Sequence, residues 1–481
     1  MSHFSQQSGL TVQRSNLHKS ILKIAVPSIL ANITIPLVGL VDMVIAGHLS
    51  SAWAIGGIAV GTMLFDMLYG CFGFLRVSTA GLTAQAYGAN DPDECGKLLV
   101  RSSAIALAGA LVIWLLQTLY LEAVLYLMPC SQEVADFARA YFKVRVWAAP
   151  ATLMIMTCKG WFIGMQDGVR AMVVDLVVNG MNMLASYLLA VHTPLGVVGV
   201  AWGTLIAQWT GLLVALAMIA LRYAKHFRLS TFDFRLSTNK RFFRLNADLF
   251  VRSLCFIVVY VGWTTISSAY GDVELAASSL MMKLFMFFSF FVDGFAYAGE
   301  ALVGKSIGEQ SSINSNSQSI VNSGSPQSTC SGVVCQSFNR QSIIRALFAW
   351  GTGVGLFFSA MYALYADAIF RSMTTDMEVV ATMHHYIGWL ILMPLVSMVA
   401  FMWDGIFAGA TQGKAIRNAM LWAAAAFALT YFLLSPFTFH LSPLPGMHSV
   451  YAAYFAHLFA RVIYLTVLFY LPSSRVLTAS E

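Results

Sequence analysis

Residues 24–46 read IAVPSILANITIPLVGLVDMVIA, an apolar run that contains a single ionisable side chain, Asp42. A transmembrane helix needs about 20 predominantly apolar residues to cross the hydrocarbon layer. No run of this kind alternates with the two-residue period of a membrane β-strand. Comparable runs follow at 54–75, 102–121, 141–163, 171–191, 197–221, 249–270, 275–304, 343–365, 379–409, 418–436 and 448–471. We therefore predict an all-α, polytopic membrane protein with twelve transmembrane helices.

The composition favours the same fold class. Of the 481 residues, 58% are apolar and only 10% are charged, whereas about 25% of an ordinary soluble domain is charged. Twelve spans of about 20 residues occupy about 240 residues, which leaves little room for a soluble domain. The seven cysteines lack metal-ligand spacing, and residues 1–20 contain no apolar core of a secretory signal.

Lys and Arg between the spans predict the orientation, because cytoplasmic loops carry an excess of both. With the N-terminus inside, the cytoplasmic side collects most of the basic residues, and the formal charge of +6 follows from topology rather than from nucleic-acid binding. Four connections on the other side carry neither residue: 47–53, 192–196, 271–274 and 437–447. The exceptions there are Arg139, Lys143, Arg145 and Arg371. We expect a multi-pass protein of the cell inner membrane with both termini cytoplasmic.

The chain also contains an internal repeat. Span four ends in a series of glycines, Gly160, Gly164 and Gly168, and span ten has the same spacing at Gly405, Gly409 and Gly413. Spans two and eight end in the related patterns Gln85-x-x-Gly88 and Lys305-x-x-Gly308. An even number of spans in each half predicts parallel repeats, related by an axis along the membrane normal, with a cavity between two lobes.

The basic stretch after span six divides the two halves. We assign residues 1–221 to an N-lobe of six helices, 222–248 to a cytoplasmic linker and 249–481 to a C-lobe of six helices. The C-lobe contains a polar insert at 309–341 that is rich in Ser, Asn and Gln. Because this composition cannot form a core, we expect a flexible cytoplasmic loop.

Asp42 is the first candidate for a functional group. It lies eighteen residues beyond Ile24, in the outer third of span one, with apolar neighbours on both sides. Burial penalises the charged form of a carboxyl, so such a group suits reversible proton binding. The alternative is a carboxylate at the outer interface that water solvates.

Span five places polar residues on one helical face, because Asp175, Asn179, Asn182 and Ser186 follow the spacing i, i+4, i+7 and i+11. In lipid this face must point into the protein. It either makes hydrogen bonds between helices or forms a cavity wall for substrate, with Asn182 and Ser186 at the depth of Asp42. Asp175 lies near the cytoplasmic end.

Span eight repeats this arrangement with Ser289, Asp293, Tyr297 and Glu300 on one face. We take Asp293, Tyr297 and Glu300 as candidate cavity residues, since an ionisable group in the hydrocarbon layer needs a partner or a water-filled cavity.

Asp404 in span ten is a further candidate, at the position that Lys159 holds in span four. Two ion pairs are attractive links between the halves: Lys159 with Asp404, and Arg76 with a carboxylate.

Several kinds of chemistry lack their sequence signatures. The chain has no nucleotide-binding Gly-x-x-x-x-Gly-Lys-Ser/Thr loop, no His-Glu-x-x-His zinc motif and no Gly-x-Ser-x-Gly elbow. We therefore expect a secondary transporter rather than an enzyme, driven by a proton gradient or alternatively by sodium, with no cofactor and no metal. Its expected partners are small organic molecules and the lipid bilayer, not nucleic acid, and we expect a monomer.

Four motifs resemble the DinF-like branch of the multidrug and toxic compound extrusion (MATE) transporters. They are PSILANITIPLVGLVDMVIAGHL at 27–49, FLRVSTAGLTAQAYG at 74–88, DGFAYAGEAL at 293–302, and WDG at 403–405 with Phe407. The resemblance implies two six-helix lobes in a V-shaped arrangement that export organic compounds by alternating access, in exchange for protons or sodium.

The resemblance also implies roles for individual residues. Asp42 matches the acid of the first helix that is associated with proton coupling, and Glu300 and Asp404 match motifs of the branch. In the fifth helix the family often has Asn-x-x-x-Asp, where this chain has Asn182 and Ser186. The missing second acid weakens the case for a sodium site.

The function that we infer at this point is proton-coupled efflux of drugs or toxic organic compounds. One alternative is a sodium-coupled antiporter of the same fold. Another is a flippase for lipid-linked precursors, which would need a basic central cavity, whereas the mid-membrane residues considered above are chiefly acids and amides. A channel or a structural membrane protein is a third alternative.

Overall fold

The computed structural model describes residues 2–49, 52–127, 131–196, 198–223, 240–323, 339–435 and 447–471. Within these ranges the chain is helical and contains no strand. The first half comprises α1 (Ser2–Leu49), α2 (Ala52–Gly70), α3 (Phe74–Gly88), α4 (Pro92–Leu127), α5 (Gln132–Arg145), the short 3-10 helix η1 (Val146–Ala148), α6 (Ala149–Gly164), α7 (Gly168–His192) and α8 (Val198–Tyr223). The second half comprises α9 (Lys240–Ser268), α10 (Asp272–Ser323), α11 (Arg340–Met373), α12 (Met377–His385), α13 (Ile387–Gly409), α14 (Gly413–Leu434) and α15 (His448–Tyr470).

The prediction of twelve transmembrane helices is confirmed. Twelve stretches of the described chain are long and apolar enough to cross a membrane, and two of them join consecutive helices, α2 with α3 and α5 with α6. The run predicted at 379–409 is divided, because α12 ends at His385 and α13 begins at Ile387.

Parts of two polar segments that were expected to form a loop and a linker are helical. The flexible loop expected over 309–341 is wrong for residues 309–323, which continue α10 as helix to Ser323, and α11 begins at Arg340. A helix that span eight has already nucleated can extend into polar sequence without a second nucleation cost. Residues 240–248 of the expected linker likewise belong to α9. The remainder of both segments, 224–239 and 324–338, lies outside the described residues.

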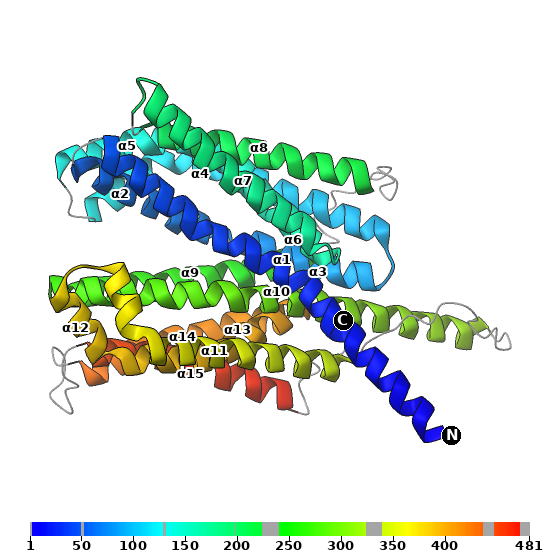
Figure 1. Ribbon diagram of the computed structural model, residues 1–481. Helices are drawn as coiled ribbons and strands as arrows, with labels where there is room; N and C mark the ends of the chain where they lie inside the picture. Colours follow the sequence, from blue (N-terminus) through cyan, green and yellow to red (C-terminus); the bar gives the residue numbers. More distant parts are fainter. Residues whose placement is uncertain are drawn as a thin grey trace.

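The helices form two bundles in a V-shaped arrangement. Helices α1–α8 make one lobe and α9–α15 the other, and the ribbons diverge toward the end that carries α2, α5 and α12 (Figure 1). The lobes meet mainly through α1 and α3 of the N-lobe and α10 of the C-lobe. α1 contributes to both lobes, since it packs along α7 and along α10.

The glycines of the internal repeat take equivalent places in the two lobes. A Cβ on Gly160 of α6 would lie 2.3 Å from the carbonyl oxygen of Arg76 in α3. A Cβ on Gly405 of α13 would lie 2.3 Å from the carbonyl oxygen of Ala296 in α10. Both positions therefore let two helix backbones touch. The predicted parallel repeat is thus visible in the packing of α6 on α3 and of α13 on α10.

The same close approach joins the two lobes to each other at one end. A Cβ on Gly88 would lie 2.0 Å from the carbonyl oxygen of Lys305, and a Cβ on Gly308 would lie 1.9 Å from that of Gln85. Next to these glycines, the Gln85 side chain donates a hydrogen bond of 2.9 Å to the carbonyl of Gly409. We refer to this contact of α3 with α10 and its surroundings as the lobe joint.

A methyl group in the lobe joint should weaken it. We expect Gly308→Ala to lower the unfolding midpoint of the purified protein in detergent, because overpacking of a close contact costs about 1–3 kcal/mol. Gly180→Ala is the matched control, since it also lies inside a helix but its Cβ would meet no atom within 4 Å. An unchanged midpoint for Gly308→Ala would show that the lobes do not rely on this contact.

Candidate functional site

Asp42 lies on α1 in the N-lobe and is buried, with 9% of its surface exposed. Its Oδ1 atom has no hydrogen-bond partner among the residues that the structure describes. The described helices therefore shield this carboxyl from solvent. A carboxyl with an unused acceptor can bind a proton or a small cation.

Two charged residues of the N-lobe, Asp66 and Arg145, were not predicted as site residues. The Arg145 guanidinium of α5 interacts electrostatically with both Asp42 and Asp66. Its centre lies 4.7 Å from the Phe65 ring centroid, and its Nη1 atom donates a hydrogen bond of 2.9 Å to the Tyr141 hydroxyl. The Nε atom of Arg145 is buried without a partner among the described residues. The N-lobe site therefore combines two carboxyls with one fixed cation.

The polar face of α7 packs largely against neighbouring helices. Asn179 donates a hydrogen bond of 2.5 Å to Thr34 of α1, and Asn182 donates one of 2.9 Å to Thr204 of α8. Ser186 donates one of 3.4 Å to the carbonyl of Val200. These are the interhelical hydrogen bonds of the first alternative. The Oδ1 atom of Asn182 is nevertheless buried without a partner in the described part of the chain.

Lys159 pairs within the N-lobe. Its ammonium nitrogen lies 2.7 Å from a carboxylate oxygen of Asp175, so α6 is joined to α7. The suggested ion pair between Lys159 and Asp404 is therefore wrong. The reason is connectivity, since α7 directly follows α6 and packs beside it, whereas Asp404 lies in the other lobe.

Arg76 forms the ion pair that links the lobes. Its Nη1 atom lies 3.0 Å from Oε2 of Glu300, whose side chain is only 2% exposed. The guanidinium carbon lies 4.1 Å from the centroid of the Tyr297 ring on the same helix. The suggestion that Arg76 pairs with a carboxylate of the other half is confirmed. The Oε1 atom of Glu300 remains without a partner among the described residues.

Asp404 is held by two arginines of its own lobe. Its Oδ2 atom accepts hydrogen bonds from Arg252 of α9 at 2.9 Å and from Arg461 of α15 at 2.5 Å. Asp293 of α10 interacts electrostatically with both of these arginines and with Arg76. We call this set the central charge cluster; it comprises Arg76, Arg252, Arg461, Asp293, Glu300 and Asp404.

The central charge cluster corrects one sequence-based statement. The mid-membrane residues are not chiefly acids and amides, because the three acids of the cluster face three arginines. Arg252 and Arg461 fall inside the predicted spans 249–270 and 448–471. The rule that selected Asp42, an ionisable side chain within an apolar run, would have found them and Asp66.

The described residues include no group of three or more His, Cys, Asp or Glu placed to hold a metal ion. The site instead offers buried carboxyls at two places. In the central charge cluster each acid has a nearby arginine, whereas the N-lobe has one cation for two acids. The arrangement can therefore bind and release protons or small cations.

Comparison with known proteins agrees with the two-lobed fold. A model of the MatE family matches residues 27–188. The DNA damage-inducible protein F of Escherichia coli is 33% identical over 443 residues, which cover 90% of this chain and 88% of that protein. The human multidrug and toxin extrusion protein 1 is 24% identical over 295 residues, which cover 60% of this chain and 51% of the relative.

Solved structures share the fold at low sequence identity. A multidrug resistance MATE family transporter in an outward-facing conformation superposes with a TM-score of 0.79 and 16% identity, over 95% of this chain and 96% of that one. A MOP superfamily transporter from Pyrococcus furiosus gives 0.78, also with 16% identity, over 94% and 95%. The resemblance in the sequence, the two-lobed fold and the relative that matches almost end to end agree, and the chain belongs to the MatE family of multidrug and toxic compound extrusion transporters, in its DinF-like branch.

Proposed function

We propose that this transporter exports small organic compounds in exchange for protons, and that Asp42 is the group that carries the proton. The observation that carries the proposal is the buried Asp42 carboxyl with an unpartnered Oδ1 among the described residues. A charge in such a place is costly, so protonation changes the free energy of the N-lobe substantially. No cofactor is needed besides the ion gradient.

The orientation follows from the basic residues near the lobe joint, which include Lys23, Arg241 and Lys305. An excess of Lys and Arg marks the cytoplasmic side, so we place the lobe joint and both termini in the cytoplasm. In the V-shaped arrangement the lobes then diverge toward the outside (Figure 1). The relative in E. coli supports an inner-membrane location.

The cycle uses Asp42 as an exchange site. In the outward-open state a proton from outside neutralises Asp42, which weakens its attraction to Arg145 and lets the contacts between α1 and α7 rearrange. Substrate leaves, the lobe joint opens, and the proton is released to the cytoplasm in the other state. One charge that moves through about 100 mV gains about 2.3 kcal/mol, enough for about a fiftyfold gradient of a neutral compound.

The N-lobe supports sodium coupling less well than proton coupling. Sodium favours several oxygen ligands, and the position one turn beyond Asn182 holds Ser186, whose hydroxyl is turned toward α8. A lipid-precursor flippase has less support as well. The three arginines of the central charge cluster are balanced by Glu300 and Asp404, which pair with them, and by Asp293, which interacts with them electrostatically, so no excess of positive charge remains for a phosphate-bearing substrate.

Removal of the titratable group should stop export. We expect Asp42→Asn to reduce dye or drug efflux in efflux-deficient cells to the level of cells without the transporter, because an amide cannot bind a proton. Asp42→Glu should retain part of the activity. Asp93→Asn, an exposed position in the first turn of α4, is the control and should export normally. Full export by Asp42→Asn at equal membrane abundance would remove Asp42 from the coupling role.

The coupling ion can be tested in proteoliposomes. With sodium replaced by choline, an imposed pH gradient should still drive substrate accumulation, and collapse of that gradient with nigericin should abolish it. Transport that follows a sodium gradient and survives the loss of the pH gradient would instead support the sodium-coupled alternative.

Arg76 and Glu300 should show a large coupling energy in a double-mutant cycle of protein stability. Removing one partner of a buried ion pair costs about 3–5 kcal/mol, because it leaves an uncompensated charge. We therefore expect Arg76→Gln and Glu300→Gln each to lower the unfolding midpoint more than the double variant does. Asp367 and Arg371, an exposed pair within α11, provide the control cycle and should couple weakly. Additive effects of the two changes at Arg76 and Glu300 would contradict a lobe-linking role.

A further inference from the structure

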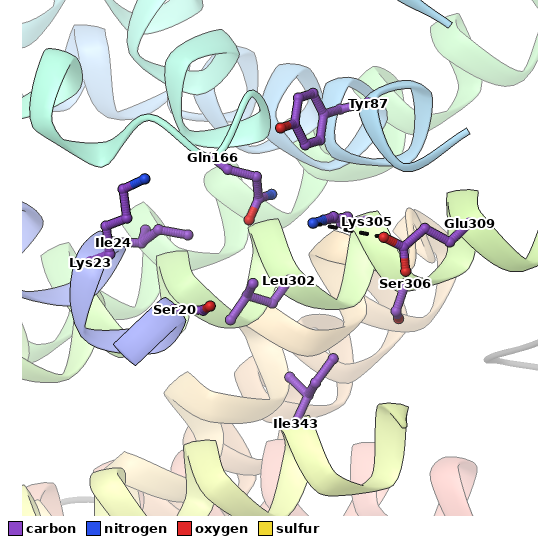
Figure 2. A pocket seen from close by; sticks show the side chains of 10 residues that line it. All are labelled: Ser20, Lys23, Ile24, Tyr87, Gln166, Leu302, Lys305, Ser306, Glu309 and Ile343. Carbon is purple, nitrogen blue, oxygen red and sulfur yellow. Dashed lines mark ion pairs between the residues drawn. The ribbon is translucent and has the colours of Figure 1, made fainter. Parts of the chain in front are cut away.

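A pocket of about 200 Å³ lies at the lobe joint and takes its walls from both lobes. Lys23 of α1 and Tyr87 of α3 belong to the N-lobe, whereas Lys305 and Glu309 of α10 belong to the C-lobe. Figure 2 shows Lys23 and Lys305 approaching from opposite sides, with the Gln166 side chain between them. The volume corresponds to about seven water molecules at about 30 Å³ each, so a small ligand fits.

Several polar groups of the pocket already donate their protons elsewhere. The Ser20 hydroxyl donates to the carbonyl of Asn16 at 2.9 Å, and the Ser306 hydroxyl donates to that of Val303 at 2.8 Å. The Gln166 amide donates to the carbonyl of Ala301 at 2.8 Å. These groups therefore contribute little to the recognition of an anion.

The donors that remain are three. Lys23 and Tyr87 line the pocket and are exposed; among the described residues Lys23 forms no ion pair and the Tyr87 hydroxyl makes no hydrogen bond. The Lys305 nitrogen lies 3.7 Å from Glu309, whereas a charge-assisted hydrogen bond measures about 2.7–2.9 Å, and it lies 5.8 Å from the Tyr87 ring centroid, so both contacts are long. Two ammonium groups against one carboxylate leave a net charge of +1 in the pocket.

We propose that this pocket binds an anion of the phosphate class between the ammonium groups of Lys23 and Lys305, with the Tyr87 hydroxyl as a third donor. The anion is either free inorganic phosphate or the headgroup of an anionic lipid. A cation is disfavoured because it would meet two ammonium groups. The proposal does not depend on Asp42 or on the coupling ion.

Binding at this place would bias the conformational equilibrium. The two lysines belong to different lobes, so a bound anion stabilises the state in which the lobe joint is closed and is released when the lobes separate. A ligand shifts such an equilibrium by its difference in affinity for the two states. The pocket is thus a regulatory site for the anion, separate from the N-lobe site and from the central charge cluster.

The test is thermal unfolding of the full-length protein in detergent with increasing inorganic phosphate, against sodium chloride of equal ionic strength. We expect a saturable rise of the midpoint with phosphate only. Lys23→Gln with Lys305→Gln should abolish the rise. Lys97→Gln with Lys414→Gln, which removes the same charge outside the pocket, should preserve it. An equal loss in both double variants, or no rise in the parent protein with either source of anion, overturns the proposal.

A variant that binds phosphate more tightly complements the loss-of-binding variants, because a folding defect would not raise the affinity. Glu309→Gln removes the carboxylate that competes with the anion, and we expect the half-saturating phosphate concentration to fall about fivefold. Tyr87→Phe should raise it. An unchanged or higher value for Glu309→Gln contradicts an anion held by Lys305.

Vesicles distinguish the two sources of the anion. If the ligand is a lipid headgroup, phosphatidylglycerol in phosphatidylcholine vesicles should stabilise the parent protein and not the Lys23→Gln, Lys305→Gln variant, while free phosphate has little effect. If the ligand is soluble, phosphate should act equally in both lipid compositions. Stabilisation by phosphatidylglycerol that is the same in the parent and the variant places the lipid elsewhere and overturns the proposal.

Discussion

The cost of an unpaired charge in a nonpolar layer governs the arrangement of this transporter. Arg76 pairs with Oε2 of Glu300 across the lobes, while Asp404 pairs with Arg252 and Arg461 within the C-lobe. A buried ion pair of this kind adds little net stability compared with apolar packing, but either half alone is expensive. The pair across the lobes therefore favours the way in which the lobes meet in this structure.

The N-lobe departs from this rule. Asp42 is buried, yet its Oδ1 atom and the Nε atom of Arg145 lack partners among the described residues. Asp404 accepts hydrogen bonds from two arginines, so we expect its charge to stay fixed during transport. Asp42 has the less satisfied environment, which suits a group that binds and releases an ion in each cycle. The two lobes share a backbone plan but hold their carboxyls in different charge environments.

The partners of the charged residues show how far the site could be predicted. Asp42 followed from a single ionisable residue within an apolar run, and Arg76 directly follows the run 54–75, because the need for a partner is local. Which residue becomes the partner depends on helices that are distant in the sequence. Lys159 and Asp404 hold matching repeat positions, yet they pair with Asp175 and with Arg252 and Arg461, because neighbouring helices of one lobe are nearer than the repeat-related helix. Asp66 and Arg145 were missed as site residues although both lie in predicted spans.

The number of spans, the absence of two-residue periodicity and the internal repeat could be predicted from the chain alone, since apolar length and glycine spacing are local properties. It also determined which side chains must find partners in the nonpolar layer. The folded arrangement was needed to show which carboxyl meets which arginine, that α10 stays helical to Ser323, and that Lys23 and Lys305 share a pocket. The physical reason is that these contacts join helices from distant parts of the chain, and their geometry depends on how the two lobes pack.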